Sequence, residues 1–423
     1  MNLIADAIPF FLLALVAEMA FDRQRGTGFF RFSDAVASLS TGALSTTTGL
    51  FTKVLELVIY AALIDHVALF RIDPALFDLS WAGIGRFLLV LLAWDFLYYW
   101  HHRFGHTVNL FWAAHVVHHQ SEDYNLSTAL RQTSTGFLFG WLFYLPLVLI
   151  GVPVQVVAAA SAIDLIYQFW VHTQHIGSLG WYDRVFVSPS NHRVHHAQNE
   201  RYLDKNYGGI LILWDRLFGT FEAEDAAEPC VFGVRKPLQR WDPIVANLQI
   251  YRETWRLASR LTSPVEKLMV WFRRPNWRPA DEGGPLTLDD SILEDFKRFQ
   301  TPLPRQRRRY VLAQFLVAVA LTGVVSIGAG LVNWPIVLLP SIALWALLVS
   351  QCRLMEYQAN SVRNELWRLI GLNPLLLLAA MFLMGFEQRI AIGLLLYTLL
   401  SVVALSGLGS DDAANIDGAQ LRQ

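Results

Sequence analysis

Histidine is the residue type in this chain whose number and spacing point most directly to chemistry. The sequence has 12 histidines, and 11 of them lie between His101 and His196. On a helix, residues at positions i, i+3 and i+4 share one face. Three clusters have this spacing, and each is expected to project its imidazoles in one direction: His102 and His106; His115, His118 and His119; His192, His195 and His196.

Such clusters predict a metal site. Neutral imidazole is the commonest side-chain ligand for transition metals. Eight imidazoles are too many for one ion, so the pattern predicts two metal ions held close together. The only cysteines, Cys230 and Cys352, lie outside the clusters, which disfavours a structural zinc site and leaves Fe, Zn, Cu and Ni as metals that imidazole suits. The alternative is a solvated histidine-rich stretch that binds metal adventitiously, and the repeated pattern disfavours it.

Composition indicates a membrane protein. The 423 residues are 54% hydrophobic and 16% charged, against about 25% charged in soluble domains, and the mean hydropathy is +0.35. A net charge of −1 gives no electrostatic case for nucleic acid. Two distant cysteines exclude a disulfide framework.

Apolar runs divide the chain. We expect membrane helices at 3–20, 36–64 and 83–100, a two-helix hairpin over 136–170 broken at Gly151-Val152-Pro153, and further helices near 310–331, 334–350, 366–386 and 390–405. The predicted fold class is an all-α, polytopic membrane protein whose His-rich di-metal domain caps a transmembrane bundle. The expected domains are N-terminal transmembrane helices (1–100), a catalytic region (101–309, including the hairpin and a cytosolic segment 171–309), C-terminal transmembrane helices (310–405) and a disordered tail (406–423).

Charge predicts the orientation. The hairpin would place segments 101–135 and 171–309 in one compartment, and together they hold 23 of the 34 Lys and Arg residues. The loop 65–81 has one Arg and three Asp. The positive-inside rule then puts the histidine clusters in the cytosol, beneath either a bacterial inner membrane or the endoplasmic reticulum. Residues 241–272 alternate apolar and basic positions, typical either of a helix in the headgroup plane or of one packed on the cytosolic domain.

The clusters and their flanks are similar to a known family. The three histidine boxes, the stretch Asp95–Arg103 before the first box, and the stretch Asp204–Thr220 after the third resemble the sterol desaturase and fatty acid hydroxylase superfamily of membrane di-iron enzymes. Asn109–His115, Asn125–Gln132 and Gln168–Thr173 resemble most the alkylglycerol monooxygenase branch. The specific resemblance covers roughly residues 85–225.

The resemblance implies a lipid monooxygenase with two Fe ions and O₂ as cosubstrate, acting on a lipid C–H bond and cleaving ether lipids if the substrate is an alkylglycerol. Hydroxylation or desaturation of a sterol, fatty acid or carotenoid is the alternative. Thr107 replaces an acidic residue of that branch, so the reductant stays open between tetrahydrobiopterin and a separate electron-transfer protein. The implied metal ligands are His102, His106, His115, His118, His119, His172, His192, His195 and His196.

Other residues have predicted supporting roles. Asp95 and Asp164 are expected to accept hydrogen bonds from metal-bound imidazoles, with a salt bridge from Asp95 to Arg86 as the alternative. His175 is a weaker ligand candidate, and His101 points off the face that holds the first box. The pair Gly208-Gly209 predicts a tight turn under the site. The non-enzymatic alternatives are a metal transporter and a metal-binding membrane scaffold, and clustering of the ligands at one membrane face disfavours transport.

Overall fold

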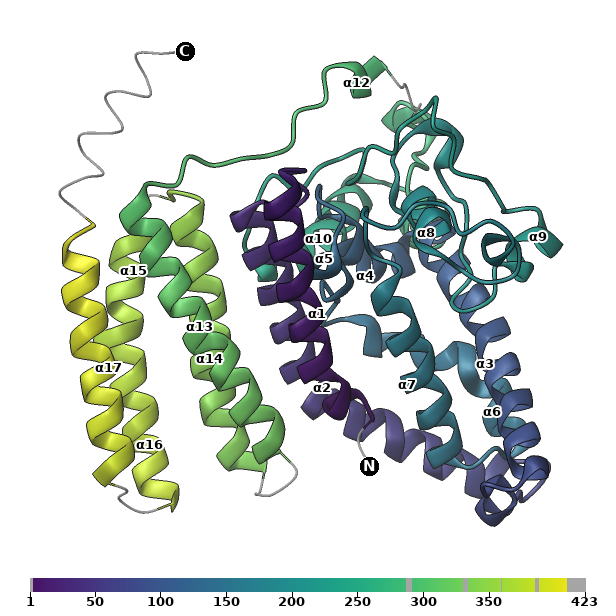
Figure 1. Ribbon diagram of the computed structural model, residues 1–423, viewed down its shortest axis with the longest axis horizontal. Helices are drawn as coiled ribbons and strands as arrows, with labels where there is room; N and C mark the ends of the chain where they lie inside the picture. Colours follow the sequence, from purple (N-terminus) through teal and green to yellow (C-terminus); the bar gives the residue numbers. More distant parts are fainter. Residues whose placement is uncertain (1–2, 287–290, 330–333, 359, 385–387, 409–423) are drawn as a thin grey trace. The chain divides into compact units, whose positions relative to one another are not determined.

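The computed structural model describes residues 3–286, 291–329, 334–358, 360–384 and 388–408 (Figure 1). Across these ranges the chain is helical and has no strand beyond two isolated antiparallel bridges, Phe186 with Leu211 and Ala197 with Phe232. The predicted all-α class is therefore confirmed. The chain forms two compact units: the first comprises residues up to 238 with 246–298, and the second comprises 239–245 with the residues from 299 onward. The domain boundaries drawn from the sequence remain predictions.

The first unit places short helices at the end of long ones. The long helices are α1 (Leu3–Arg25), α2 (Phe32–Val67), α3 (Trp81–Thr107) and α7 (Val154–Trp170). At one end of α3 and α7 lie α4 (Asn109–His119), α5 (Leu126–Ala129), α8 (Pro189–His196) and α9 (Leu213–Phe218) (Figure 1). The remaining helices of this unit are α6 (Leu145–Ile150), most of α10 (Pro243–Arg260), α11 (Pro264–Phe272) and α12 (Ser291–Glu294).

Aromatic packing holds α3 against its neighbours. Trp94 of α3 stacks on Tyr144, with ring centroids 3.8 Å apart and an interplanar angle of 6°. Leu147 and Val148 of α6 and Ala160 of α7 are buried in the same cluster. Stacked aromatic rings add to the stabilisation that burial alone provides. This core fixes α3 beside α7, so that the last turns of both helices end near one another.

Among the residues that the structure describes, five segments are long and apolar enough to cross a bilayer: Trp81–Thr107, Arg305–Gly328, Ile336–Met355, Ser361–Leu383 and Gln388–Ser406. They support a multi-pass membrane protein. Helices α1 and α2 form where the sequence predicts them. The last turns of α1 carry Glu18 and Asp22, both buried. Glu18 accepts hydrogen bonds from the Thr173 hydroxyl and the Leu126 N–H, so this end of α1 belongs to the protein interior.

The predicted hairpin at 136–170 is correct in its second arm only. Its break is where expected, because Gly151 has φ of 88° and ends α6. A Cβ at Gly151 would overlap the carbonyl oxygen of Phe70, so glycine is required there. The second arm is α7, a helix of 17 residues. The first arm is not one helix, because 3-10 turns at Gly136–Leu138 and Gly140–Tyr144 precede the six-residue α6.

The second unit is a helical bundle with a buried ion pair in its interior. It contains α13 (Arg305–Gly328), α14 (Trp334–Met355), α15 (Ser361–Trp367), a π-helical turn (Arg368–Leu372), α16 (Asn373–Met384) and α17 (Gln388–Ser406), which match the four predicted apolar runs. Arg368 and Glu365 form a buried ion pair at 2.7 Å, and the Tyr310 hydroxyl donates to Glu365 at 2.6 Å. Buried charges in a membrane bundle need such partners. Residues 409–423 of the predicted tail lie outside the described residues.

Candidate metal centre

Four helices deliver the nine predicted ligands to one place. Helix α3 carries the first box in its last two turns, α4 carries the second, α8 carries the third, and His172 lies two residues after the end of α7. Helix α8 begins with Ser188, whose hydroxyl accepts from the Asn191 N–H, followed by Pro189. Such a cap fixes the start of a short helix. The third box therefore has a defined orientation although α8 has only eight residues.

The nine imidazoles gather in two sets. In each set the potential ligand nitrogens lie within 4.8 Å of one another. The first imidazole set contains His102, His106, His115, His119 and His195. The second imidazole set contains His118, His172, His192 and His196. The second and third boxes each contribute to both sets, so the two sets lie side by side.

Within each set the Nε2 atoms face one another at short range. In the first set, Nε2 of His115 lies 3.0 Å from those of His102 and His119. In the second set, Nε2 of His172 lies 3.1 Å from those of His118 and His192. Neighbouring nitrogen ligands around a metal at about 2.1 Å are also about 3 Å apart. The spacing therefore fits a metal ion at the centre of each set.

Backbone carbonyls orient four of the rings. The Nδ1–H groups of these imidazoles donate at 2.8–2.9 Å to carbonyl oxygens: His102 to Tyr207, His118 to Arg131, His172 to Gln168 and His195 to Lys205. A carbonyl oxygen only accepts, so each of these rings carries its proton on Nδ1. The Nε2 lone pairs then point at one another, which is repulsive unless a cation lies between them. The donor chemistry of both sets fits a metal.

Burial keeps the imidazoles neutral. It lowers the pKa of His118 to about 4 and the pKa of His195 to about 3, because a charged ring is poorly solvated there. The carbonyl bonds from Arg131 and Lys205 oppose this shift but are weaker. Neutral imidazole is the form that binds metal, so both rings are in the binding form at pH 7.

The metal-free protein is therefore expected to lose stability as the pH falls. In the unfolded chain His118 and His195 take up protons near pH 6.5, whereas in the folded chain they do so only near pH 4 and 3. Between these values the unfolded state binds more protons, so stability is complete above about pH 6.5 and declines below it, by about 1.4 kcal/mol per pH unit for each such histidine. Thermal unfolding of metal-free protein at pH 7.5, 6 and 5 measures this. A His118→Asn variant should show a shallower decline, and equal unfolding temperatures at pH 7.5 and 5 would contradict the argument.

Two buried carboxylates shape the loop that carries the Tyr207 carbonyl. Asp95 of α3 accepts from the N–H groups of Ile210 (2.7 Å) and Leu211 (3.1 Å) and from the indole of Trp214 (2.8 Å). Asp215 of α9 accepts from the N–H groups of Tyr207 and Gly208, each at 2.7 Å. Between them the two carboxylates bind the backbone N–H groups of residues 207, 208, 210 and 211. The loop is thereby held where the Tyr207 oxygen meets His102.

The hydrogen-bond partners of Asp95 differ from both partners that the sequence predicted. The sequence predicted that Asp95 binds a metal-bound imidazole, with a salt bridge to Arg86 as the alternative. Asp95 instead binds backbone and indole N–H groups, and Arg86 donates to the Leu76 carbonyl at 2.7 Å. Backbone carbonyls take the place of the expected carboxylate at the four oriented rings. Asp95 thus acts on His102 through the loop.

Asp164 also contacts a histidine only indirectly, through another residue. It accepts from the side-chain amide of Gln168 at 2.9 Å, and the Gln168 backbone carbonyl holds Nδ1 of His172. The predicted direct bond from Asp164 to an imidazole is therefore replaced by a link through Gln168. The other oxygen of Asp164, Oδ1, is buried and has no hydrogen-bond partner in the described structure.

Gly209 lies in the predicted turn and allows the loop 207–211 to approach α3 and α7 closely. A Cβ there would lie 2.5 Å from Asp164 Oδ1, 2.8 Å from the Tyr98 ring and 3.0 Å from Asp95 Oδ1. We expect Gly209→Ala to destabilise the protein by about 1–3 kcal/mol through overpacking. Thermal unfolding in detergent measures the effect, with Gly177→Ala as the control, because a Cβ at Gly177 meets nothing within 4 Å. Equal unfolding temperatures for the two variants would show that the loop has room to move.

The remaining histidines of this region lie outside both sets. Nδ1 of His101 lies 3.3 Å from the Tyr144 hydroxyl, and its ring stacks on Phe143. His175 lies near Phe21 and Phe29 of the first unit, with its Nε2 3.9 Å from Asp22. The weaker suggestion that His175 is a ligand is therefore not supported by its position. His101, expected to be solvated or beside the metal ligands, packs among aromatic rings instead.

Sequence reasoning missed two acidic residues that support the centre. Asp215 is fully buried beneath the loop 207–211. Glu18 of α1 holds Thr173, the residue after His172, through a hydrogen bond of 2.5 Å. An acidic residue within an apolar run was the available signal for Glu18, because such a group is retained only with a partner. Asn206 donates its side-chain amide to the Asn191 and Glu222 carbonyls.

Comparison with known proteins decides the family. The sequence profile of the fatty acid hydroxylase family matches residues 87–220, which contain all nine imidazoles of the two sets. Human alkylglycerol monooxygenase is 37% identical over 322 residues, covering 75% of this chain and 69% of the human protein. The chain belongs to the fatty acid hydroxylase family. The zebrafish (Danio rerio) alkylglycerol monooxygenase is 31% identical over 367 residues, covering 86% of this chain and 80% of that protein.

A shorter similarity extends to another member of this group. Ornithine lipid hydroxylase OlsE of Rhizobium tropici is 30% identical over 143 residues, or 34% of this chain and 43% of that protein. No solved structure matches the chain. The family, the apolar helices and the imidazole sets agree on one function. The protein is a membrane lipid hydroxylase, an oxidoreductase whose histidines fit a metal site.

Proposed function

We propose that this enzyme is a di-iron monooxygenase that cleaves the ether bond of alkylglycerols. The single observation that carries the proposal is the pair of adjacent imidazole sets, in which neighbouring Nε2 atoms lie as close as 3.0–3.2 Å and all ligand nitrogens of a set lie within 4.8 Å. Imidazole-rich sites suit iron. The similarity to alkylglycerol monooxygenases over three quarters of the chain supports the substrate class. Both sets would then hold one iron ion each, with the nine histidines as ligands.

Two bound iron ions would supply the activation of O₂ and of a lipid C–H bond. The overall reaction adds one oxygen atom beside the ether oxygen and reduces the other to water, with two electrons and two protons from a reductant. The hemiacetal so formed breaks its C–O bond to give a fatty aldehyde and free glycerol. The reductant is tetrahydrobiopterin or a separate electron-transfer protein.

The protein's own contribution is to hold the ligands and exclude water. Carbonyl oxygens fix the ring orientation at four histidines before metal binds, which lowers the cost of assembling the site. His119, His172, His192, His195 and His196 are all less than 5% exposed. The exposed leucines of α3, such as Leu88, Leu89 and Leu92, present an apolar surface on the helix that carries the first box.

Charge supports a cytosolic position for the centre. The segments that contain the short helices hold most of the Lys and Arg residues of the chain. Arg305, Arg307, Arg308 and Arg309 lie in the first turns of α13, a candidate span. The positive-inside rule places these segments in the cytosol. The membrane would be a bacterial inner membrane or the endoplasmic reticulum.

The decisive experiment follows aldehyde release from an ether lipid. Full-length enzyme, expressed with iron supplied and reconstituted in nanodiscs, is given 1-O-hexadecylglycerol or its ester counterpart 1-palmitoylglycerol. Tetrahydrobiopterin and a ferredoxin system are tested separately as reductants. We expect hexadecanal from the ether lipid only, with one of the two reductants. Hydroxylated product without chain cleavage, from the ester or a free fatty acid, would overturn the ether-lipid assignment while keeping the oxygenase.

A further inference from the structure

The outer face of α10 and α11 combines arginines that have no acidic partner among the described residues with exposed aromatic and aliphatic side chains. The inner face of α10 is buried through Thr254, Leu257 and Ala258. The outer face exposes Trp255 by 68%, and α11 exposes Val265, Leu268 and Phe272 by more than half. Single exposed apolar residues are common, whereas a contiguous group on two helices marks an interaction surface.

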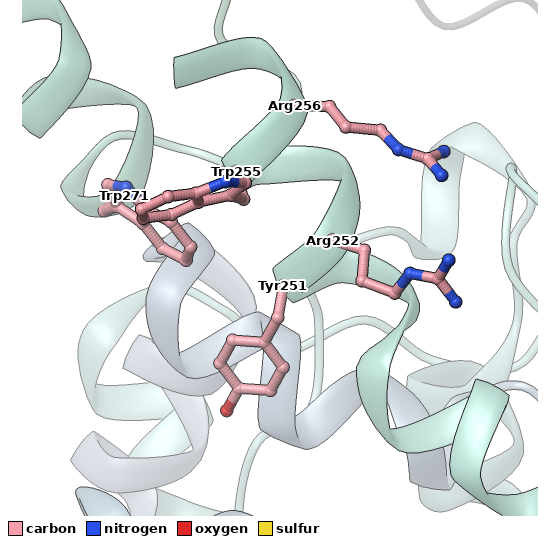
Figure 2. Close-up of a pocket in the computed structure, with 5 residues that line it drawn as sticks. All are labelled: Tyr251, Arg252, Trp255, Arg256 and Trp271. Carbon is pink, nitrogen blue, oxygen red and sulfur yellow. The ribbon is translucent and has the colours of Figure 1, made fainter. Parts of the chain in front are cut away.

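A hollow of about 430 Å³ lies on this face, lined by Tyr251, Arg252, Trp255, Arg256 and Trp271. In Figure 2, Arg252 and Arg256 extend from one side of α10, and the indoles of Trp255 and Trp271 lie on its other side. The Tyr251 hydroxyl donates to Thr135 at 3.2 Å and ties this part of α10 to the rest of the unit. The hollow is thus lined by three aromatic side chains and two arginines.

The two arginines lack an acidic partner. Across the described part of the chain, neither guanidinium makes a hydrogen bond or an ion pair, whereas Arg260 on the same helix pairs with Glu282 at 3.5 Å. Like charges at positions i and i+4 repel. Their placement is therefore unfavourable without a bound anion. Guanidinium groups bind phosphate through charge-assisted and often bidentate hydrogen bonds.

The position of α11 fits the depth of the lipid headgroups. Asn109, two residues beyond the end of the span α3, donates its side-chain amide to the Val270 carbonyl of α11 at 2.8 Å and to Thr254 of α10 at 2.9 Å. The Asn109 N–H donates to the Arg273 carbonyl at 2.9 Å. Both helices are thereby fixed beside the last turn of α3, the helix that contains a candidate membrane span. A nucleic acid or an acidic protein would also suit the arginines, but not the exposed Val265, Leu268 and Phe272.

We propose that α10 and α11 lie in the headgroup layer and bind an anionic phospholipid. Its phosphate would contact Arg252 and Arg256, and its glycerol and upper acyl chain would lie on Trp255 and Trp271. Tryptophan is favoured at this depth of a bilayer, and basic residues there attract anionic lipids. The site is separate from the imidazole sets and does not depend on the reaction that they support.

Quenching by brominated lipids tests the proposal on the full-length protein in nanodiscs. The fluorescence quenching that is due to Trp255 is obtained by subtracting the quenching of Trp255→Phe from that of the wild type. This difference is measured with phosphatidylcholine or phosphatidylglycerol brominated high in the acyl chain. We expect Trp255 to be quenched by both lipids, at least twofold more by phosphatidylglycerol at 0.1 M salt. The excess should shrink at 0.5 M salt, where charges are strongly screened.

Substitution of the arginines supplies the control. Arg252→Gln/Arg256→Gln should remove the phosphatidylglycerol excess, and Arg252→Lys/Arg256→Lys should retain part of it. Arg201→Gln should leave it unchanged, because Arg201 is already paired with Glu222 and Asp225. Circular dichroism of each variant verifies that the helices are intact. No quenching of Trp255 by either lipid, or equal quenching by both, would overturn the proposal.

Discussion

Removing one imidazole set is expected to lower the bound metal from about two ions per chain to about one and to reduce oxygenase activity by more than about 100-fold. The variants are His115→Ala/His195→Ala for the first set and His172→Ala/His192→Ala for the second. Each pair deletes central Nε2 donors of one set and none of the other. Activity should fall in both variants, because the reaction needs both ions.

The measurement is metal content by mass spectrometry on protein expressed with iron, alongside aldehyde release from the ether lipid. His175→Ala is the matched control, because it removes an imidazole of the same region that lies outside both sets. It should keep both metal and activity. A first-set or second-set variant that retained its full metal content would show that those histidines do not hold a metal.

The boxes could be predicted from the sequence because helical spacing is local. The spacing places His115, His118 and His119 on one side of α4, but it does not reveal that His118 turns toward a different set from the other two. That division depends on where α7 and α8 end, since His172 and His192 approach only His118 among the three. Pairings across more than fifty residues cannot be read from periodicity.

The supporting residues show the same limit. Asp95 was identified as a functional carboxylate because a charge near a membrane helix needs a partner. Its partners, Ile210 and Leu211, lie more than one hundred positions away in the sequence. They bind through backbone N–H groups, which nearly every residue type has, so the residue types do not reveal the contact. The last turns of α1 show the same limit, because the sequence does not reveal that Glu18 there accepts a hydrogen bond from Thr173. Family similarity covered the boxes but not these contacts.

Asp95→Ala is expected to destabilise the protein by about 3–5 kcal/mol, because three buried donors lose their acceptor. The N–H groups of Ile210 and Leu211 and the Trp214 indole all bind its carboxylate. The loop 207–211 would then relax, and the Tyr207 carbonyl would no longer hold Nδ1 of His102. We therefore expect the first imidazole set to lose metal more readily than the second.

Thermal unfolding in detergent and the rate of metal loss to a chelator measure the two effects in the same preparation. Asp95→Asn keeps one oxygen acceptor and should lie between alanine and the wild type. Asp78→Ala is the control, because this exposed carboxylate binds only Ser80 among the described hydrogen bonds and lies at the opposite end of α3. A loss of stability without faster metal release would separate Asp95 from the metal centre and leave it a purely structural residue. The alternative result is faster metal release from the first set in Asp95→Ala, with an intermediate rate in Asp95→Asn. It would show that α3 positions its own ligand, His102, through contacts that run from Asp95 to the Tyr207 carbonyl.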